Sequence, residues 1–121
     1  MTKAEVNGML VKLVIEFVNK EFKDVTLKQV GDSLTQFQDL ISAASQAISL
    51  DEFMLYIAYK AAKARQNDLW RDFGGTLNKF IKDEIADTGT SEQEKVANLQ
   101  QAMGYLMWAA YAAARGVLQH V

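Results

Sequence analysis

The sequence predicts an all-α protein, a compact bundle of about five helices that forms a single domain over residues 1–121. Proline is absent and only seven glycines occur, so the turn residues that separate β-strands are scarce. Apolar residues recur at spacings of three and four along most of the chain, which is the period of an α-helix. Half of the residues are hydrophobic, enough to close one core without a structural metal.

Capping boxes mark the expected starts of four helices. In this motif Ser or Thr is followed three residues later by Glu or Gln, and the two side chains satisfy backbone N–H groups at the helix start. The pairs are Thr2 with Glu5, Thr26 with Gln29, Ser49 with Glu52, and Ser91 with Glu94. We therefore expect a helix to begin directly after each of these Ser and Thr residues.

The first three helices are expected in the N-terminal half of the chain. The first runs from Thr2 to about Phe22, with an apolar stripe made of Val6, Leu10, Leu13, Val14, Phe17 and Val18. The second begins at Thr26 and carries its stripe as far as Ala44. The third follows Ser49, and the residues expected to face the core are Phe53, Met54, Ile57, Ala58 and Ala61.

The fourth helix is expected over Leu77 to Ile85, and the fifth over Glu92 to about Leu118. The fifth helix contains the longest apolar run of the chain, which is shorter than the roughly 20 residues that span a bilayer. The N-terminal segment is interrupted by charged residues and does not read as a signal peptide. We expect a soluble, cytoplasmic protein with no membrane segment.

The segment ARQNDLWRDFGGTLNKF, residues 64–80, is expected to be a helix junction. Gly74 and Gly75 each lower helix propensity by about 1 kcal/mol relative to alanine, so they either break the helix or only bend it, and they match no phosphate-binding motif. If they break it, Thr76 would cap a helix that starts at Leu77, and the free N–H groups of that helix would form a weak anion site.

The composition excludes several kinds of chemistry. The chain has no cysteine, so neither a disulfide framework nor a thiolate metal site is expected. The acidic residues that precede the last helix, among them Asp83, Glu84 and Asp87, suit the dipole of its N-terminus rather than a two-metal site. We therefore expect no metal and no cofactor.

Basic residues are concentrated in residues 60–82. This window carries a net charge of +4, whereas the whole chain carries −2. Concentrated positive charge is typical of a surface that contacts a phosphate backbone. The candidate RNA-binding residues are Lys60, Lys63, Arg65, Arg71 and Lys79. Trp70 and Phe73 lie in the same window and either stack bases or pack in the core.

Two segments of the chain resemble a known family. FMLYIAYKAAKAR (53–65) and AMGYLMWAAYAAARGVL (102–118) are similar to the central and last helices of the small all-helical subunit of type III CRISPR effector complexes, of the Cmr and Csm types. The resemblance implies a non-catalytic subunit in antiviral defence, copies of which stack along the complex and line the groove that holds guide RNA paired with its target.

The same resemblance implies the partners and part of the site. The partners would be other subunits of the effector complex, copies of the chain itself, and guide and target RNA or single-stranded DNA. The family's basic positions match Lys60, Lys63 and Arg65 at the end of the central helix. Arg71 and Lys79 join them on the basis of local charge alone.

A second resemblance favours an enzyme instead. The only histidine, His120, follows Arg115 by five residues in ARGVLQHV. This spacing resembles the Arg-x4-His motif of HEPN ribonucleases, small helical bundles in which two protomers attack RNA through its own 2′-hydroxyl. His120 would transfer protons and Arg115 would hold the scissile phosphate, roles that suit these side chains.

The alanine-rich last helix allows a third function without RNA. Small residues lie on more than one of its faces, beside Trp108 and Tyr111. Such a helix is either fully buried in its own bundle or shared with a second copy. A homodimeric interaction module therefore stands beside the effector subunit and the ribonuclease as an alternative.

Overall fold

The computed structural model describes residues 2–65 and 68–120. The described residues fold into helices and short connections, with no β-strand among them, so the predicted all-α class is confirmed. The six α-helices are α1 (Lys3–Glu21), α2 (Leu27–Asp32), α3 (Leu34–Gln46), α4 (Leu50–Lys63), α5 (Leu69–Phe80) and α6 (Glu92–Ala114). Three short turns complete the order, namely η1 (Ile81–Ile85), η2 (Ala86–Thr88) and η3 (Leu118–His120).

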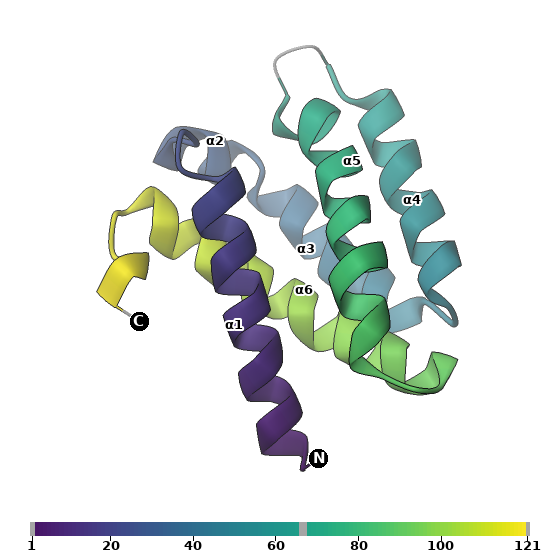
Figure 1. Cartoon of the computed structure of the whole chain (residues 1–121). Helices are drawn as coiled ribbons and strands as arrows, with labels where there is room; N and C mark the ends of the chain where they lie inside the picture. The colour runs from purple at the N-terminus through teal and green to yellow at the C-terminus, as the bar shows by residue number, and fades with distance from the viewer. Residues whose placement is uncertain (1, 66–67, 121) are drawn as a thin grey trace.

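Helix α6 is the centre of the bundle. It contacts α1, α2, α3 and α4, and it runs behind α1 in Figure 1. Helices α4 and α5 lie side by side as an antiparallel pair on one side of the molecule (Figure 1). No helix within the described ranges has both the length and the apolar character needed to cross a membrane.

The predicted helix starts are confirmed by their caps. Thr2 and Thr26 form complete capping boxes. In each box the threonine hydroxyl accepts the backbone N–H of the residue three positions later, and the Glu or Gln side chain of that residue accepts the backbone N–H of the threonine. At α4 and α6 the serine hydroxyl accepts the backbone N–H of Glu52 and Glu94 at 3.1 Å. Hydroxyl donors from Thr90 and Ser91 hold the pKa of the Glu94 carboxyl below its ordinary value.

The second predicted helix is divided in two by the structure. The backbone leaves helical geometry at Ser33, which is buried and separates α2 from α3. The three residues Gly31, Asp32 and Ser33 have low helix propensity, so this is the weakest point of the segment. The predicted stripe is nevertheless retained, because Val30, Phe37, Leu40 and Ala44 are all buried.

The prediction of a junction at the two glycines is wrong. Helix α5 begins at Leu69, runs through Gly74 and Gly75, and is continued by the π-helical turn η1. Its cap is Asp68, whose Oδ1 accepts the backbone N–H of Trp70 at 3.0 Å. Helix α4 therefore ends at Lys63, before the glycines, and Thr76 is inside α5, so no anion site exists at the N–H groups after it.

Close packing explains why Gly74 is tolerated within a helix. A Cβ built on Gly74 would lie 2.6 Å from the Cβ of Ala61 on α4, so the two helices approach too closely for a side chain. The burial gained by this approach offsets the intrinsic cost of glycine, which is about 1 kcal/mol. Gly75 faces open space and has no comparable role.

An aromatic cluster forms the core beneath α5. Trp70 contacts Phe37 and Phe73 edge-on, with ring centroids 5.3 and 5.0 Å apart, and Phe73 contacts Phe22 at 4.8 Å. Trp70 is 1% exposed and Phe73 6%, so neither ring can stack on an incoming base. The interpretation of these two aromatics as base-stacking residues is therefore wrong, and they are core residues.

Helix α6 ends four residues earlier than predicted. Gly116 has φ of +74°, and its N–H donates to the carbonyl of Ala113, while the N–H of Val117 donates to Ala112. This pair of bonds is a Schellman cap, which glycine forms without the steric cost of a Cβ. Leu118 consequently returns to the core after the turn instead of extending the helix.

Candidate nucleic-acid interface

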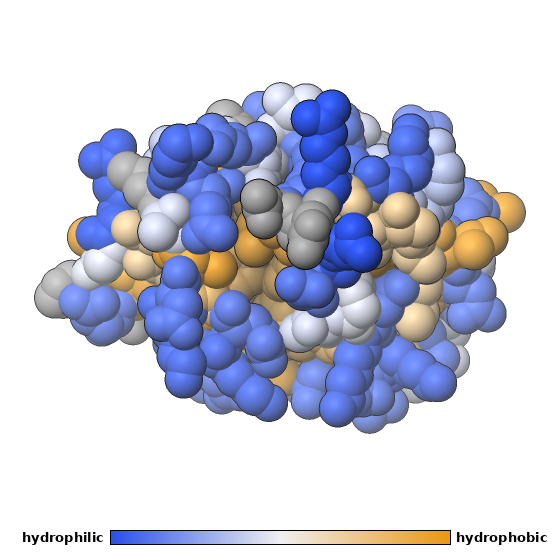
Figure 2. Space-filling view, turned by 90° about the horizontal axis from the view of Figure 1, so that it is seen from above, coloured by the Kyte–Doolittle hydropathy of each residue, from blue (hydrophilic) through white to orange (hydrophobic). Residues whose placement is uncertain are grey.

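A groove of about 300 Å³ lies where the end of α4 meets α3 and the start of α5. The residues that line it are Gln36, Tyr56, Tyr59, Lys60, Lys63, Ala64, Asp68 and Trp70. We call it the basic groove, because two of the predicted RNA-binding lysines line it. Viewed from the end of the molecule that carries the α4–α5 connection, a band of hydrophobic residues runs between two hydrophilic margins (Figure 2).

Each lysine of the basic groove lies over a tyrosine one helical turn earlier. The Nζ of Lys60 is 5.5 Å from the ring centroid of Tyr56, and the Nζ of Lys63 is 5.1 Å from that of Tyr59. These distances are within the range of cation–π attraction, which holds the ammonium groups over the ring faces. Tyr59 is 56% exposed, so its ring remains accessible to a ligand.

Two carboxylates moderate the charge of this groove. Asp39 on α3 lies 3.6 Å from the Nζ of Lys60, an ion pair in which the lysine side chain is only 16% exposed. Asp68 lines the groove, and its two oxygens accept hydrogen bonds from the backbone of Trp70 and the side chain of Gln36. Lys63 is the more exposed of the two lysines, and no ion pair holds it among the described residues.

The antiparallel packing of α4 and α5 brings Arg71 to the same end of the molecule. Gly74 lies against Ala61, and the Asn78 side chain donates to the carbonyl of Met54 at 2.9 Å, which fixes the direction of the pair. Arg71, in the first turn of α5, is therefore level with the last turn of α4. Arg65 is exposed just beyond α4, so four of the five predicted basic residues gather here.

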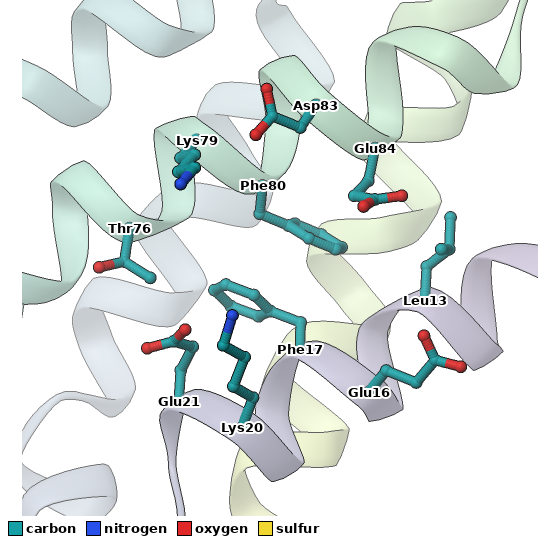
Figure 3. Close-up of a pocket in the computed structure, with 10 residues that line it drawn as sticks. All are labelled: Leu13, Glu16, Phe17, Lys20, Glu21, Thr76, Lys79, Phe80, Asp83 and Glu84. Carbon is teal, nitrogen blue, oxygen red and sulfur yellow. The ribbon is translucent and has the colours of Figure 1, made fainter.

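Lys79 is not part of this group. It lines a second groove of about 390 Å³ between α1 and the α5–η1 segment, whose floor is the stacked pair Phe17 and Phe80, 4.4 Å apart (Figure 3). The charged residues around this floor are Glu16, Lys20, Glu21, Lys79, Asp83 and Glu84. We call it the acidic groove, because its four carboxylates outnumber its two ammonium groups. The sequence grouped Lys79 with Lys60 and Lys63, but the structure places it in a different groove.

The sequence interpretation missed the polar and aromatic residues of the basic groove. Tyr56 with Lys60 and Tyr59 with Lys63 both have a spacing of four, which places each pair on one face of a helix. This repeated Tyr–Lys spacing in YIAYKAAK was the available signal.

The prediction that Ala58 faces the core is wrong. It is exposed on the outer face of α4 beside Leu55 and Tyr59.

The structure does not place Arg115 and His120 on one helix. Arg115 is the exposed C-terminal cap of α6, and His120 belongs to the turn η3 that follows the Gly116 reversal. The side chain of His120 lies outside the described part of the structure. The ribonuclease function that this pair would carry therefore stays a prediction.

A third groove, of about 230 Å³, is almost wholly apolar and lies between α1 and α6. Trp108 is 68% exposed at its edge, and Tyr105, Ala109 and Leu118 contribute to its walls. A large exposed tryptophan beside an apolar depression is typical of a protein contact surface. This groove lies on the helix that the sequence predicted to be shared between copies.

The comparisons with known proteins give no family. Neither protein-family models nor curated proteins nor solved structures match this chain. Within the described residues, no group of three or more His, Cys, Asp or Glu side chains is arranged to hold a metal ion.

Proposed function

We propose that this chain is a non-catalytic, RNA-binding subunit of a ribonucleoprotein complex, of the kind formed by the small helical subunits of type III CRISPR effectors in antiviral defence. One observation carries the proposal. Lys60 and Lys63 lie over the rings of Tyr56 and Tyr59 along one groove, with Arg65 and Arg71 at the same end of the bundle.

This arrangement suits single-stranded nucleic acid. Ammonium and guanidinium groups neutralise successive phosphates, and an exposed tyrosine face accepts a base by stacking. Lys60 first has to leave Asp39, and because the Asp39 side chain is 52% exposed, water can solvate its carboxylate when the ion pair opens. Lys63 needs no such release.

The proposed subunit contributes binding and not chemistry. A nucleophile with a nearby general base is the usual mark of a catalytic centre, and the basic groove contains lysine, tyrosine, glutamine and aspartate side chains engaged with one another. Cleavage of RNA would then belong to other subunits of the complex. The proposed partners are those subunits, further copies of this chain, and the guide and target strands.

The test is fluorescence anisotropy of end-labelled single-stranded RNA, recorded over time and over a series of salt concentrations. We expect a stable rise that weakens with added salt. The double variant Lys60→Glu, Lys63→Glu should bind at least about tenfold more weakly at low salt. Its plot of log affinity against log salt should be shallower by roughly 1.4, since a single strand loses about 0.7 per phosphate contact.

The matched control reverses two lysines in the acidic groove. Lys20→Glu, Lys79→Glu makes the same change in net charge, and we expect its RNA affinity to stay within about twofold of the parent chain, since long-range attraction is screened by salt. Equal losses in both double variants would contradict a site at the basic groove. A rise that decays as the RNA shortens would favour the Arg115 and His120 ribonuclease.

The apolar groove supports a second candidate, a homodimeric interaction module. Trp108 is the exposed anchor on which a second copy would pack. Light scattering across a concentration series tests it, because Trp108→Asp should abolish a dimer while the exposed control Gln101→Asp should not. A parent chain that stays monomeric at every concentration would rule this candidate out.

A further inference from the structure

The outer face of α4 carries a stripe of apolar residues. Leu55 and Tyr59 are 72% and 56% exposed, and Ala58 and Ala62 are exposed beside them. Spacings of three and four place these residues on one face of the helix, opposite the buried Ile57. We call this set the α4 stripe. Helix α4 lies at the edge of the bundle, with α5 beside it (Figure 1), so the α4 stripe is open to a partner.

The two ends of the α4 stripe carry opposite charges. Asp51 and Glu52 are exposed in the first turn of α4, whereas Lys63 is exposed in its last turn and Arg65 just beyond it. A partner of uniform charge would be repelled by one of these ends. A second copy of the chain is complementary to both ends, because antiparallel packing brings the acidic start of each α4 beside the basic end of the other. Antiparallel packing also sets the two helix dipoles in the favourable direction.

One register of this packing matches side-chain size and charge together. It has a twofold axis that passes between positions 58 and 59 of α4. The residue pairs that lie equally far from this axis are Ala58 with Tyr59, Leu55 with Ala62, and Glu52 with Arg65. Each large side chain therefore meets an alanine of the copy, and each carboxylate meets a guanidinium group. The alanines let the two helices approach closely, because the distance between packed helices depends on the side chains at their contact.

We propose that two copies of this chain pair through the α4 stripe, antiparallel and about that twofold axis. The pairing surface is separate from the apolar groove at Trp108 on α6, and it does not depend on the proposed RNA binding. Tyr59 belongs both to the α4 stripe and to the basic groove, so the second copy and a stacked base compete for its ring. Helix α4 has 14 residues and is about 21 Å long. A contact of this size is at the small end of specific interfaces, so we expect a dissociation constant in the micromolar range.

The first experiment measures sedimentation over a series of concentrations in the micromolar range. We expect the parent chain to pass from monomer to dimer, and Leu55→Asp to dimerise at least about tenfold more weakly, because each dimer would bury two unpaired carboxylates. The control Trp108→Asp changes another exposed apolar residue and should dimerise as the parent does. A parent chain that stays monomeric, or a loss in Trp108→Asp that equals or exceeds the loss in Leu55→Asp, overturns the pairing through α4.

The second experiment tests the antiparallel register by reversing charges. Glu52→Lys and Arg65→Glu should each weaken the dimer about tenfold at low salt, because both charge contacts of the dimer become repulsive. The double variant Glu52→Lys, Arg65→Glu exchanges the two charges and should restore the affinity of the parent. The single variants shift the net charge in opposite directions, so a loss in both cannot come from net charge.

The outcome of the charge reversal decides between this register and any other. Single variants that dimerise as the parent does, or a double variant as weak as the single ones, would overturn the antiparallel pairing. Thermal melting identifies any variant that loses its fold, which is not expected since Glu52, Leu55 and Arg65 are all exposed. None of these measurements uses RNA, so a parent chain that dimerises and binds no RNA would refute the proposed function and support the pairing.

Discussion

The basic and acidic grooves lie on different sides of α5 and contain the same number of lysines in different surroundings. On the α4 side, Lys60 and Lys63 lie over tyrosine rings. On the α1 side, Lys20 and Lys79 lie among four carboxylates above a buried phenylalanine pair (Figure 3). A run of positive charge in the sequence therefore predicts a binding surface only where the fold does not surround it with a larger number of acidic side chains.

The floors of the two grooves differ as much as their charges. Phe17 and Phe80 are 8% and 7% exposed and belong to the core of the bundle. Tyr59, which borders the basic groove, is 56% exposed and adds little to that core. The aromatic residues of the acidic groove thus stabilise the core of the bundle. Tyr59 contributes little to that core, and its exposed ring is accessible to a ligand.

The largest expected effect is a difference in unfolding free energy between a variant of the acidic groove and a variant of the basic groove. Phe80→Ala should lower the free energy of unfolding by about 3–5 kcal/mol, because it removes a buried ring that stacks on Phe17. Tyr59→Ala should lower it by less than about 1 kcal/mol, because most of that side chain is already in water. Urea unfolding followed by circular dichroism measures both, and similar losses would show that the two floors are equally structural.

A smaller effect tests how α5 is held against α4. Gly74→Ala should destabilise the protein by about 1–3 kcal/mol, because its Cβ would meet the Cβ of Ala61 at 2.6 Å. The neighbouring Gly75→Ala should stabilise it by about 1 kcal/mol, since nothing lies within 4 Å and alanine favours the helix. Opposite shifts in the thermal midpoint are expected. A destabilising Gly75→Ala would contradict a continuous α5.

The smallest effect concerns the ion pair at the edge of the basic groove. Asp39→Asn frees Lys60, and we expect RNA to bind about twofold to threefold more tightly at low salt, with stability changed by less than about 1 kcal/mol. Asp83→Asn in the acidic groove makes the same charge change and should leave RNA affinity unaltered. Anisotropy titrations compare the two, and equal tightening would indicate a net-charge effect alone.

Local sequence signals predicted most of the helices. The Ser and Thr residues before α1, α2, α4 and α6 cap those helices as expected, because a cap depends only on residues three positions apart. The core stripe of α1 is also confirmed, with Leu10, Val14, Phe17 and Val18 buried. The start of α5 was missed, because its cap is a lone aspartate without the partner that completes a capping box.

The candidate site was predicted only in part. Lys60, Lys63 and Arg65 are close in sequence on or just after one helix, so their grouping required no knowledge of the fold. Gln36 comes from a different helix, and its place beside Trp70 depends on how α3 packs against the α4–α5 pair. Lys79 was misplaced for the same reason, since the side of α5 on which it lies depends on the packing of α1.

The sequence by itself determined the all-α class, the starts of α1, α2, α4 and α6 and the local concentration of basic residues, because each of these depends on neighbours within one or two helical turns. The tertiary structure decided that α4 and α5 approach closely at Gly74, that Trp70 is a core residue, and that Lys79 lies among carboxylates. Those outcomes depend on contacts between helices, and such contacts are fixed by packing of the whole bundle rather than by local propensity.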